Sequence, residues 1–190
     1  MRTSRALVFV FLSWVAAQPA SGAHSPVASD PSRVVFDSNQ DVQRFYGIPI
    51  DLTLADLKRL RFPTKVRYER GEDSQYSVYR VSAHDGVHIE LTFDSDGKLS
   101  RADTKSSKAI GPKGIRVGSL LSEVRSAWPN GKLLYGNEDG AFVTFVTGTN
   151  VLYLFDPNEM PPQAFDPDYR TSRNIDVPDI KVKEIRLYRR

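Results

Sequence analysis

His84, His88 and Glu90 are the residues whose types and spacing come nearest to a metal or hydrolytic site. His88 and Glu90 share one face of a predicted strand because side chains alternate along a strand, and His84 lies across the preceding turn. Imidazoles and carboxylates bind zinc, and a histidine can act as a general base. The sequence has no cysteine, no Gly-x-Ser-x-Gly and no recognisable catalytic motif around either histidine. We therefore interpret these side chains as the polar face of a half-buried strand, and we predict no metal, no cofactor and no enzymatic activity.

Two turns contain residues that also occur in ligand-binding loops. Asp94–Gly97 reads Asp-Ser-Asp-Gly, but it lacks the third acidic position and the distal glutamate of a calcium loop. Gly111–Gly114 reads Gly-Pro-Lys-Gly, but it lacks the Gly-Lys-Ser/Thr ending and the following helix of a phosphate loop. The first sequence is typical of a β-hairpin and the second of a linker.

Phe165, Tyr169 and Arg170 lie in a proline-bearing segment, residues 157–170, for which no helix or strand is predicted. Long loops inside compact domains are uncommon and are usually functional or disordered. Aromatic residues and arginine are enriched in protein interfaces. We predict that these three side chains bind a partner; the alternative is that Phe165 and Tyr169 pack the loop against the edge of its own sheet. Further candidate binding residues on predicted strands are Tyr76, Arg80, His88 and Tyr153.

The N-terminal residues predict export. A short basic segment precedes the apolar run Ala6–Ala17, which is too short to span a bilayer, and small residues at Ser21 and Ala23 fit a signal-peptidase site. We predict a signal peptide over residues 1–23, cleavage after Ala23, and a polar leader over residues 24–37. The mature protein is expected in the periplasm or outside the cell, without a membrane span.

Charge and cysteine content limit the possible partners and bonds. Loss of the signal peptide removes two arginines and lowers the formal net charge from +3 to +1. A nearly neutral chain gives no reason to expect binding to nucleic acid. Because the sequence has no cysteine, no disulfide can hold the fold in an oxidising compartment. Stability must therefore come from the hydrophobic core.

Two short amphipathic helices organise the predicted fold. Residues 48–63 and 115–129 each contain an apolar pair, a turn, a helix with apolar residues at helical spacing, and an aromatic residue followed by proline. Their similarity predicts a duplicated unit. Thr53 and Asp56 form a capping-box pattern at the first helix, and Ser119 is the predicted cap of the second.

The remaining mature chain is predicted to form mainly strands. Four follow each helix, over residues 65–69, 75–82, 87–93 and 98–104, and over residues 132–135, 141–147, 150–155 and 180–188. We predict an α+β fold of two tandem helix-plus-four-strand antiparallel meander units, residues 38–105 and 115–190, with a linker over residues 106–114. The first unit begins with a further helix over Asn39–Tyr46, and the second contains a long loop, residues 156–179.

The pattern resembles two groups of known proteins. A helix introduced by Ile115–Ser119 (Ile-Arg-Val-Gly-Ser) and followed by four strands, occurring twice, resembles the β-lactamase inhibitor proteins and, as a single unit, the small lipoprotein of the outer-membrane β-barrel assembly machinery. The segments Leu99–Asp103, Gly114–Gly118 and Ile185–Arg190 resemble an uncharacterised family of Gram-negative envelope lipoproteins. That family is anchored through a lipobox cysteine, which this sequence lacks. In the inhibitor proteins the exposed concave face of the sheet grips the target, which for this chain is an analogy of fold.

The function predicted from these observations is the binding of another macromolecule. The expected partner is an envelope protein or a secreted hydrolase that the protein inhibits. One alternative is a module that holds a small molecule or lipid between helix and sheet, and another is a hydrolase that uses His84, His88 and Glu90. The sequence does not decide the oligomeric state or whether the sheets of the two units join.

Overall fold

The computed structural model describes residues 34–36, 41–59, 63–70, 75–83, 86–137, 140–165 and 176–190. The predicted signal peptide and most of the predicted leader lie outside these ranges. Among the helices of the described segments, none is long and apolar enough to cross a membrane.

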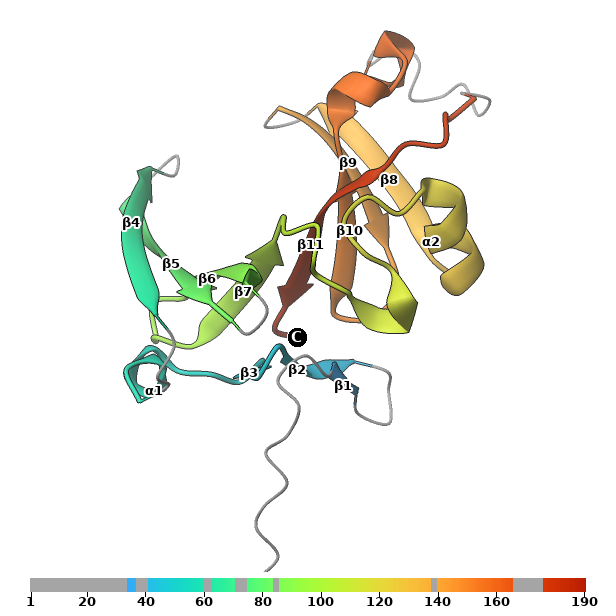
Figure 1. Cartoon of the computed structure of the whole chain (residues 1–190). Coiled ribbons are helices and arrows are strands. Elements are labelled where there is room, and N and C mark those ends of the chain that lie inside the picture. Colours follow the sequence, from blue (N-terminus) through green and yellow to red (C-terminus); the bar gives the residue numbers. More distant parts are fainter. Residues whose placement is uncertain are drawn as a thin grey trace, which may run out of the picture.

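Eight antiparallel strands form one continuous sheet in the order β4-β5-β6-β7-β11-β10-β9-β8 (Figure 1). Their bounds are β4 Thr64–Arg70, β5 Gln75–Ser82, β6 His88–Phe93, β7 Leu99–Thr104, β8 Lys132–Asn137, β9 Ala141–Val146, β10 Val151–Phe155 and β11 Val182–Tyr188. The predicted strands therefore exist, and β7 pairs directly with β11. The sheet bends at this pair, so that β4–β6 and β8–β10 rise as two walls on either side of it (Figure 1).

The predicted fold class is wrong. The protein is mostly β, with one large eight-stranded sheet in place of two tandem helix-plus-four-strand units, and the helices α1, Leu54–Leu57, and α2, Leu121–Ala127, are short. The physical reason is that β7 and β11 each have a free edge after the local hairpins form. Pairing these edges satisfies two rows of backbone hydrogen bonds at once.

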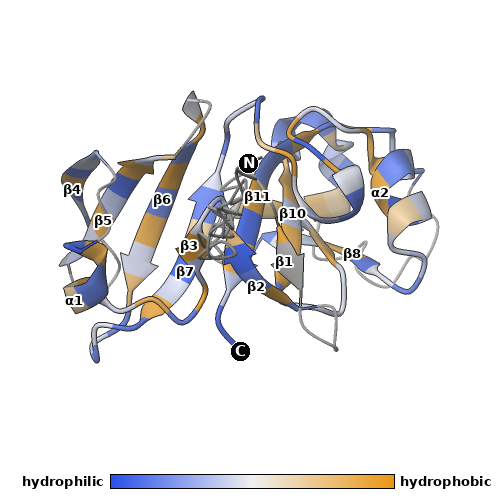
Figure 2. Cartoon of the chain, turned by 60° about the horizontal axis from the view of Figure 1, so that its bottom comes forward, coloured by the Kyte–Doolittle hydropathy of each residue, from blue (hydrophilic) through white to orange (hydrophobic). Residues whose placement is uncertain are grey.

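The N-terminal residues form a small second sheet, and the described part of the segment predicted as a helix over Asn39–Tyr46, residues 41–46, contains a strand in its place. Strands β1 Val35–Phe36, β2 Val42–Phe45 and β3 Ile48–Pro49 pair in chain order, and Tyr46 and Gly47 turn the chain with φ of 50° and 82°. The backbone of Val42 is held by the side chain of Asn150: the Val42 N–H donates to Oδ1 at 2.7 Å, and Nδ2 donates to the Val42 carbonyl at 2.9 Å. This long-range pairing favours an extended backbone over a local helix. Figure 2 shows the small sheet lying across β7 and β11.

The two helices are capped in different ways. At α1 the Thr53 hydroxyl accepts from the Asp56 N–H at 3.1 Å, as the capping-box pattern predicts. At α2 the predicted cap, Ser119, is not used. The Leu120 N–H donates to the Glu123 carboxylate at 2.7 Å, and Asp179 accepts from the Ser122 N–H at 2.8 Å. Asp179 stands at the end of the long loop, which therefore returns to fix the start of α2.

The core lies between the large sheet and the elements packed on one of its faces. Ile89, Leu91, Ile185, Leu187, Tyr153 and Phe145 point into it from the strands. Leu57 of α1, Leu121 and Val124 of α2, and Phe45 and Ile48 of the small sheet belong to the same buried cluster. The long loop also contributes Met160 and Ala164, which follow or lie in the short 3-10 turns η3, Pro157–Glu159, and η4, Pro162–Phe165. The linker forms a third such turn, η2, Pro112–Gly114.

Candidate functional site

The strand register places one row of side chains across all eight strands on the uncovered side of the sheet. Residues directly opposite in an antiparallel pair point to the same face, so each cross-strand pair extends the row. From β4 to β8 the row reads Lys65, Arg80, Glu90, Asp103, Arg186, Leu152, Val146 and Lys132. A second row beside it reads Glu184, Leu154, Thr144 and Leu134 from β11 to β8. We call the surface formed by these rows and their same-face neighbours the open face.

Ion pairs fill the part of the open face that lies on β4–β7. The Glu90 carboxylate accepts from Arg80 Nε at 3.1 Å through one oxygen and from Arg67 Nη2 at 2.8 Å through the other. The Glu90 side chain is 18 % exposed, while the two arginine side chains are 48 % and 46 % exposed. The carboxylate is therefore largely withdrawn from water and the guanidinium groups remain accessible to a partner.

A second cluster of charges joins the two halves of the sheet. Arg186 on β11 donates to Asp103 on β7 at 2.8 Å through Nε and to Glu184 at 2.8 Å through Nη2. Burial raises the pKa of Asp103, although Arg186 and Arg101 both oppose this effect. Burial also lowers the pKa of Arg186, but the charges of Asp103 and Glu184 outweigh it, so the net shift is upward. Arg186 thus stays charged and balances the charge of the two buried carboxylates.

Toward β8 the open face becomes apolar. Leu134 is 49 % exposed and Phe142 is 38 % exposed, and both lie on this face because Leu134 is opposite Thr144 and Phe142 is two residues from Thr144 along β9. Leu134 and Phe142 are thus diagonal neighbours across the β8–β9 pair, and large side chains at such positions are close enough to contact each other. A hollow of about 240 Å³ at the end of β9 and β10 is lined by Phe142, Leu154 and Pro157 among others. The open face therefore combines an arginine-rich half and an apolar half.

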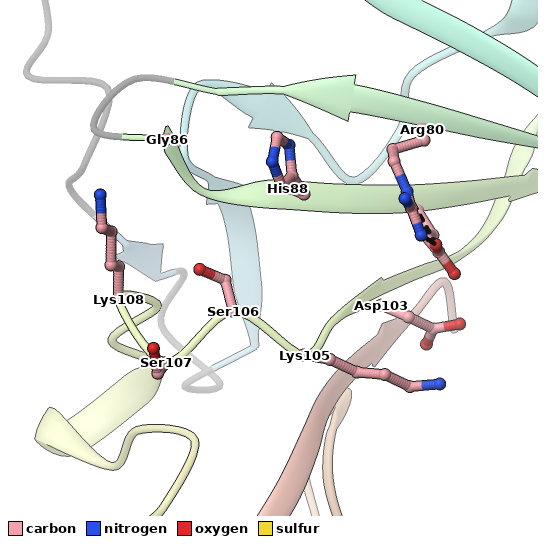
Figure 3. A pocket seen from close by; sticks show the side chains of 9 residues that line it. Arg80, Gly86, His88, Asp103, Lys105, Ser106, Ser107 and Lys108 are labelled. Atoms are coloured by element: carbon pink, nitrogen blue, oxygen red, sulfur yellow. Dashed lines mark hydrogen bonds and ion pairs between the residues drawn. The ribbon is translucent and has the colours of Figure 1, made fainter.

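A pocket of about 400 Å³ opens at the end of β5, β6 and β7 (Figure 3). It is lined by Arg80 of β5, by Gly86, His88 and Glu90 in and before β6, by Asp103 of β7, and by the loop of residues 105–108. Lys105 lines this pocket and also the apolar hollow, so the two depressions adjoin. The Lys105 amine lies 3.3 Å from the Glu184 carboxylate, and the Lys105 side chain is 63 % exposed.

The predicted binding residues fall into three groups. Tyr76, Arg80 and His88 lie on the open face, where the Tyr76 hydroxyl donates to Glu69 at 3.0 Å. Tyr153 is fully buried on the covered face, where its hydroxyl donates to the Pro112 carbonyl at 3.1 Å and accepts from Trp128 Nε1 at 3.4 Å. Burial raises the pKa of Tyr153, so the phenol stays protonated. The Tyr153 side chain is therefore part of the core and is not available for contact with a partner.

The proline-bearing segment, residues 157–170, is only partly described. Phe165 is half-buried and packs against the core, while Tyr169 and Arg170 lie outside the described residues. The geometry of Phe165 fits the alternative in which the loop packs on its own domain.

Hydrolytic chemistry finds little support around His88. Its Nδ1 lies 3.2 Å from the Ser82 hydroxyl, a distance at which a base could activate a nucleophile. In the described parts of the chain no carboxylate hydrogen-bonds the other ring nitrogen, although an orienting group of this kind completes known triads. The described residues also include no group of three His, Asp or Glu side chains able to hold a metal, and His84 lies outside them.

Several residues of the open face were not singled out from the sequence. Ser106 and Lys108 lie in the predicted linker and Lys105 directly precedes it, and Leu134 and Phe142 lie on strands without clear alternation. Apolar residues on both faces of β9 are typical of a strand covered on both sides, whereas the structure leaves Phe142 exposed. The sequence signal that could have identified the loop of residues 105–108 is its run of basic and hydroxyl side chains directly after a strand.

Comparison with known proteins finds a structural similarity and no match to a family model. No family model matches the sequence, and no curated protein matches it. Among solved structures, the crystal structure of the uncharacterized protein YfeY from Escherichia coli is similar to this chain, with a TM-score of 0.49 and 20 % sequence identity. The match covers 74 % of this chain and 90 % of that chain.

Proposed function

We propose that this chain is an exported, periplasmic or secreted protein-binding module and that the open face is its contact surface. The observation that carries the proposal is that this face presents exposed Leu134 and Phe142 on β8 and β9 and accessible Arg67 and Arg80 on β4 and β5, while most of the other face is covered by the chain's own elements. The export is supported by the signal-peptide pattern of residues 1–23.

The composition of the open face suits a protein partner. Interface cores are enriched in aromatic residues and arginine, and energetically important residues cluster where they can be desolvated. Exposed apolar side chains that adjoin one another mark interaction sites more often than scattered ones. Leu134 and Phe142 would supply an apolar contact that is desolvated on binding, and the arginines on β4 and β5 would supply directed hydrogen bonds.

The open face is also held in place before binding. Glu90 fixes two arginines, and Arg186 is fixed by two carboxylates. Side chains that are already ordered lose less entropy on association, so more of the contact energy appears as affinity. Inhibition of a secreted hydrolase is one form that such binding would take, because the partner's own active site would supply the complementary surface.

Affinity capture with matched variants tests the proposal. Wild-type protein, Phe142→Glu and the control Tyr68→Glu would be used as baits against envelope extract. Tyr68 is 69 % exposed and lies on the other face of β4, so both variants place a carboxylate at an exposed aromatic position. We expect Phe142→Glu to lose a protein that wild type and Tyr68→Glu both retain. Equal capture by all three baits would count against the open face.

A further inference from the structure

We propose that the free edge of β8 receives an extended segment of the protein partner, which adds an antiparallel strand to the large sheet. The segment would carry apolar side chains on one of its faces and an acidic residue beside Lys132, the first residue of β8. The inference rests on the proposed function, because it describes how one part of that partner contacts the protein next to the open face. The evidence is the backbone geometry of β8, the groove along this strand and the charge of the groove.

The backbone of β8 presents hydrogen-bonding groups at its outer edge. Hydrogen-bonded and non-hydrogen-bonded pairs alternate along an antiparallel ladder. The Tyr188 N–H donates to the Asn150 carbonyl at 3.1 Å, and the strand registers from β11 to β8 extend this alternation across the sheet. Leu134 therefore bonds to β9, whereas the N–H and C=O groups of Leu133 and Tyr135 point away from it. Among the described strands only β9 pairs with β8, so these groups face outward.

The other edge strand of the large sheet is less suited to strand addition. Four of the seven residues of β4 are charged, namely Lys65, Arg67, Glu69 and Arg70. Charged residues along an edge oppose the pairing of another strand. The central residues of β8, Leu133–Tyr135, are uncharged, so β8 lacks this protection. Every ladder of the sheet is antiparallel, and we infer the same direction for the added strand.

A groove of about 600 Å³ lies along the start of β8, and this volume is within the range of known binding sites. The helix α2 lies beside β8 at this end of the sheet (Figures 1 and 2), and Trp128 at its C-terminus lines the groove together with Val177 of the long loop. Leu133 and Tyr135 are half-buried on the same side of the sheet, where Leu133 is opposite the core residue Phe145. Residues of the added strand that bond to Leu133 and Tyr135 would direct their side chains to this apolar side.

The groove carries positive charge that its lining does not balance. Arg125 of α2 and Lys132 of β8 line the groove and are exposed, while none of the described aspartates and glutamates lines it. Within the described ranges neither cation forms an ion pair. The Lys132 side chain lies on the open face, so an acidic residue on that face of the added strand would stand opposite it. The charge of the groove therefore favours an acidic segment.

A strand added to β8 would also extend the open face. Leu134 points to that face from β8, and Phe142 lies diagonally across from it on β9. Alternate side chains of the added strand would lie beside Leu134, because cross-strand neighbours share a face. The same partner would thus contact the apolar part of the open face and pair with the edge of the sheet.

Titration of the labelled full chain with a short peptide, followed by amide NMR signals, tests the inference. The probe is acetyl-Thr-Val-Thr-Val-Glu-amide, whose valines stand opposite Tyr135 and Leu133 and whose glutamate stands opposite Lys132 in the inferred register. We expect saturable shifts centred on β8. A methyl group on the nitrogen of the second valine removes the donor to the Leu133 carbonyl and should weaken binding by about tenfold. The matched control carries the methyl group on the nitrogen of the central threonine, which points away from β8, and should bind within about twofold of the probe.

Equal effects of the two methyl groups, or the absence of saturable shifts at β8, would overturn the inference. A larger effect of the methyl group on threonine would overturn the antiparallel register, because a parallel strand would donate from that residue.

Two substitutions of one residue separate the backbone contact from the side-chain contact. Leu133→Pro removes the N–H that points away from β9, and edge strands tolerate proline at such positions. Leu133→Ala also shortens the side chain but keeps this N–H. We expect the probe to bind about tenfold more weakly to Leu133→Pro than to Leu133→Ala, and urea unfolding verifies that both variants are folded. Equal affinity of the two folded variants would contradict strand addition.

A charge variant and a lipid probe complete the test. Lys132→Gln should weaken the probe by about two- to fivefold, as expected for an exposed ion pair, and replacement of the peptide's glutamate by glutamine should have a similar effect. Unchanged affinity in both cases would remove the acidic residue from the inference. Decanoate represents a lipid that would use the same apolar wall and the same cations. Tighter binding of decanoate than of the probe, with no effect of Leu133→Pro, would overturn strand addition in favour of a lipid. If strand addition failed while capture of a protein still depended on Phe142, the proposed function would stand without it.

Discussion

Replacing Asn150 with alanine should detach the small N-terminal sheet from the large one. Asn150 is 3 % exposed, and its side chain satisfies both backbone polar groups of Val42, which is fully buried. After Asn150→Ala neither group has its partner. A buried polar group left unsatisfied costs about 1 to 3 kcal/mol, so for the two groups we expect a loss of about 2 to 6 kcal/mol in the free energy of unfolding. With a typical urea dependence of about 2 kcal/mol/M, the unfolding midpoint should fall by about 1 to 3 M.

Hydrogen exchange and a second variant distinguish this mechanism from a general loss of packing. The Val42 amide should exchange much faster in Asn150→Ala, while amides in β5 and β6 should change only as far as global stability does. In Asn150→Asp the Val42 N–H keeps an acceptor, but its carbonyl faces a carboxylate oxygen in place of a donor. The stability of this variant should approach that of wild type as the pH is lowered, because the protonated carboxyl regains an O–H donor. A midpoint for Asn150→Ala within the experimental error of wild type would refute the reasoning.

Three further predictions concern the core and a surface turn. Tyr153→Phe removes the hydroxyl that bonds the Pro112 carbonyl and should lower the free energy of unfolding by about 1 to 2 kcal/mol in urea. Gly131→Ala would place a Cβ 2.2 Å from a ring carbon of Phe145, so calorimetry should show a loss of about 1 to 3 kcal/mol, whereas an unchanged melting temperature would mean that the ring moves freely. Hydrogen bonds from backbone N–H groups and a nearby guanidinium hold the pKa of Asp94 below its usual value. Its contribution to stability is therefore present above about pH 4 and lost as the pH falls through the folded pKa, so the gap between wild type and Asp94→Asn at pH 7 should close in acid.

Local patterns in the sequence predicted the local structure well. The pairing of Thr53 with Asp56 predicted the start of α1, because a cap involves residues three apart. Strict alternation predicted β6, with Ile89 and Leu91 buried and His88 exposed. The bounds predicted for β5, residues 75–82, agree with those observed.

Features that depend on distant residues were not predicted. The helix expected over Asn39–Tyr46 has helical spacing of apolar residues, but its segment is held extended by Asn150, more than a hundred positions away. The joining of the sheet likewise depends on β7 meeting β11, where Arg186 pairs with Asp103 across the seam. No local pattern in either strand identifies its partner, so the sequence analysis left this question open.

The candidate site shows the same division. Alternation along β6 predicted that His88 and Glu90 share one face, and they do, whereas Arg80 joins them only through the pairing of β5 with β6. Tyr153 is a predicted binding residue only because of its residue type. Apolar residues occupy both faces of β10, so its sequence does not indicate which face is turned to the core. Lys108 and Ser106 reach the pocket only because their loop bends back over β6, which follows from hydrogen bonds between separate segments.

Site-specific photo-crosslinking in cells that produce the protein tests the central claim most directly. A photoreactive phenylalanine analogue would replace Phe142 on the open face in one sample and Tyr68 on the opposite face in the other. Both positions are exposed aromatic residues of the same sheet, so the analogue itself should be tolerated equally. The account predicts a discrete covalent adduct with another protein from position 142 and none from position 68. No adduct from position 142, or the same adduct from both positions, would contradict it.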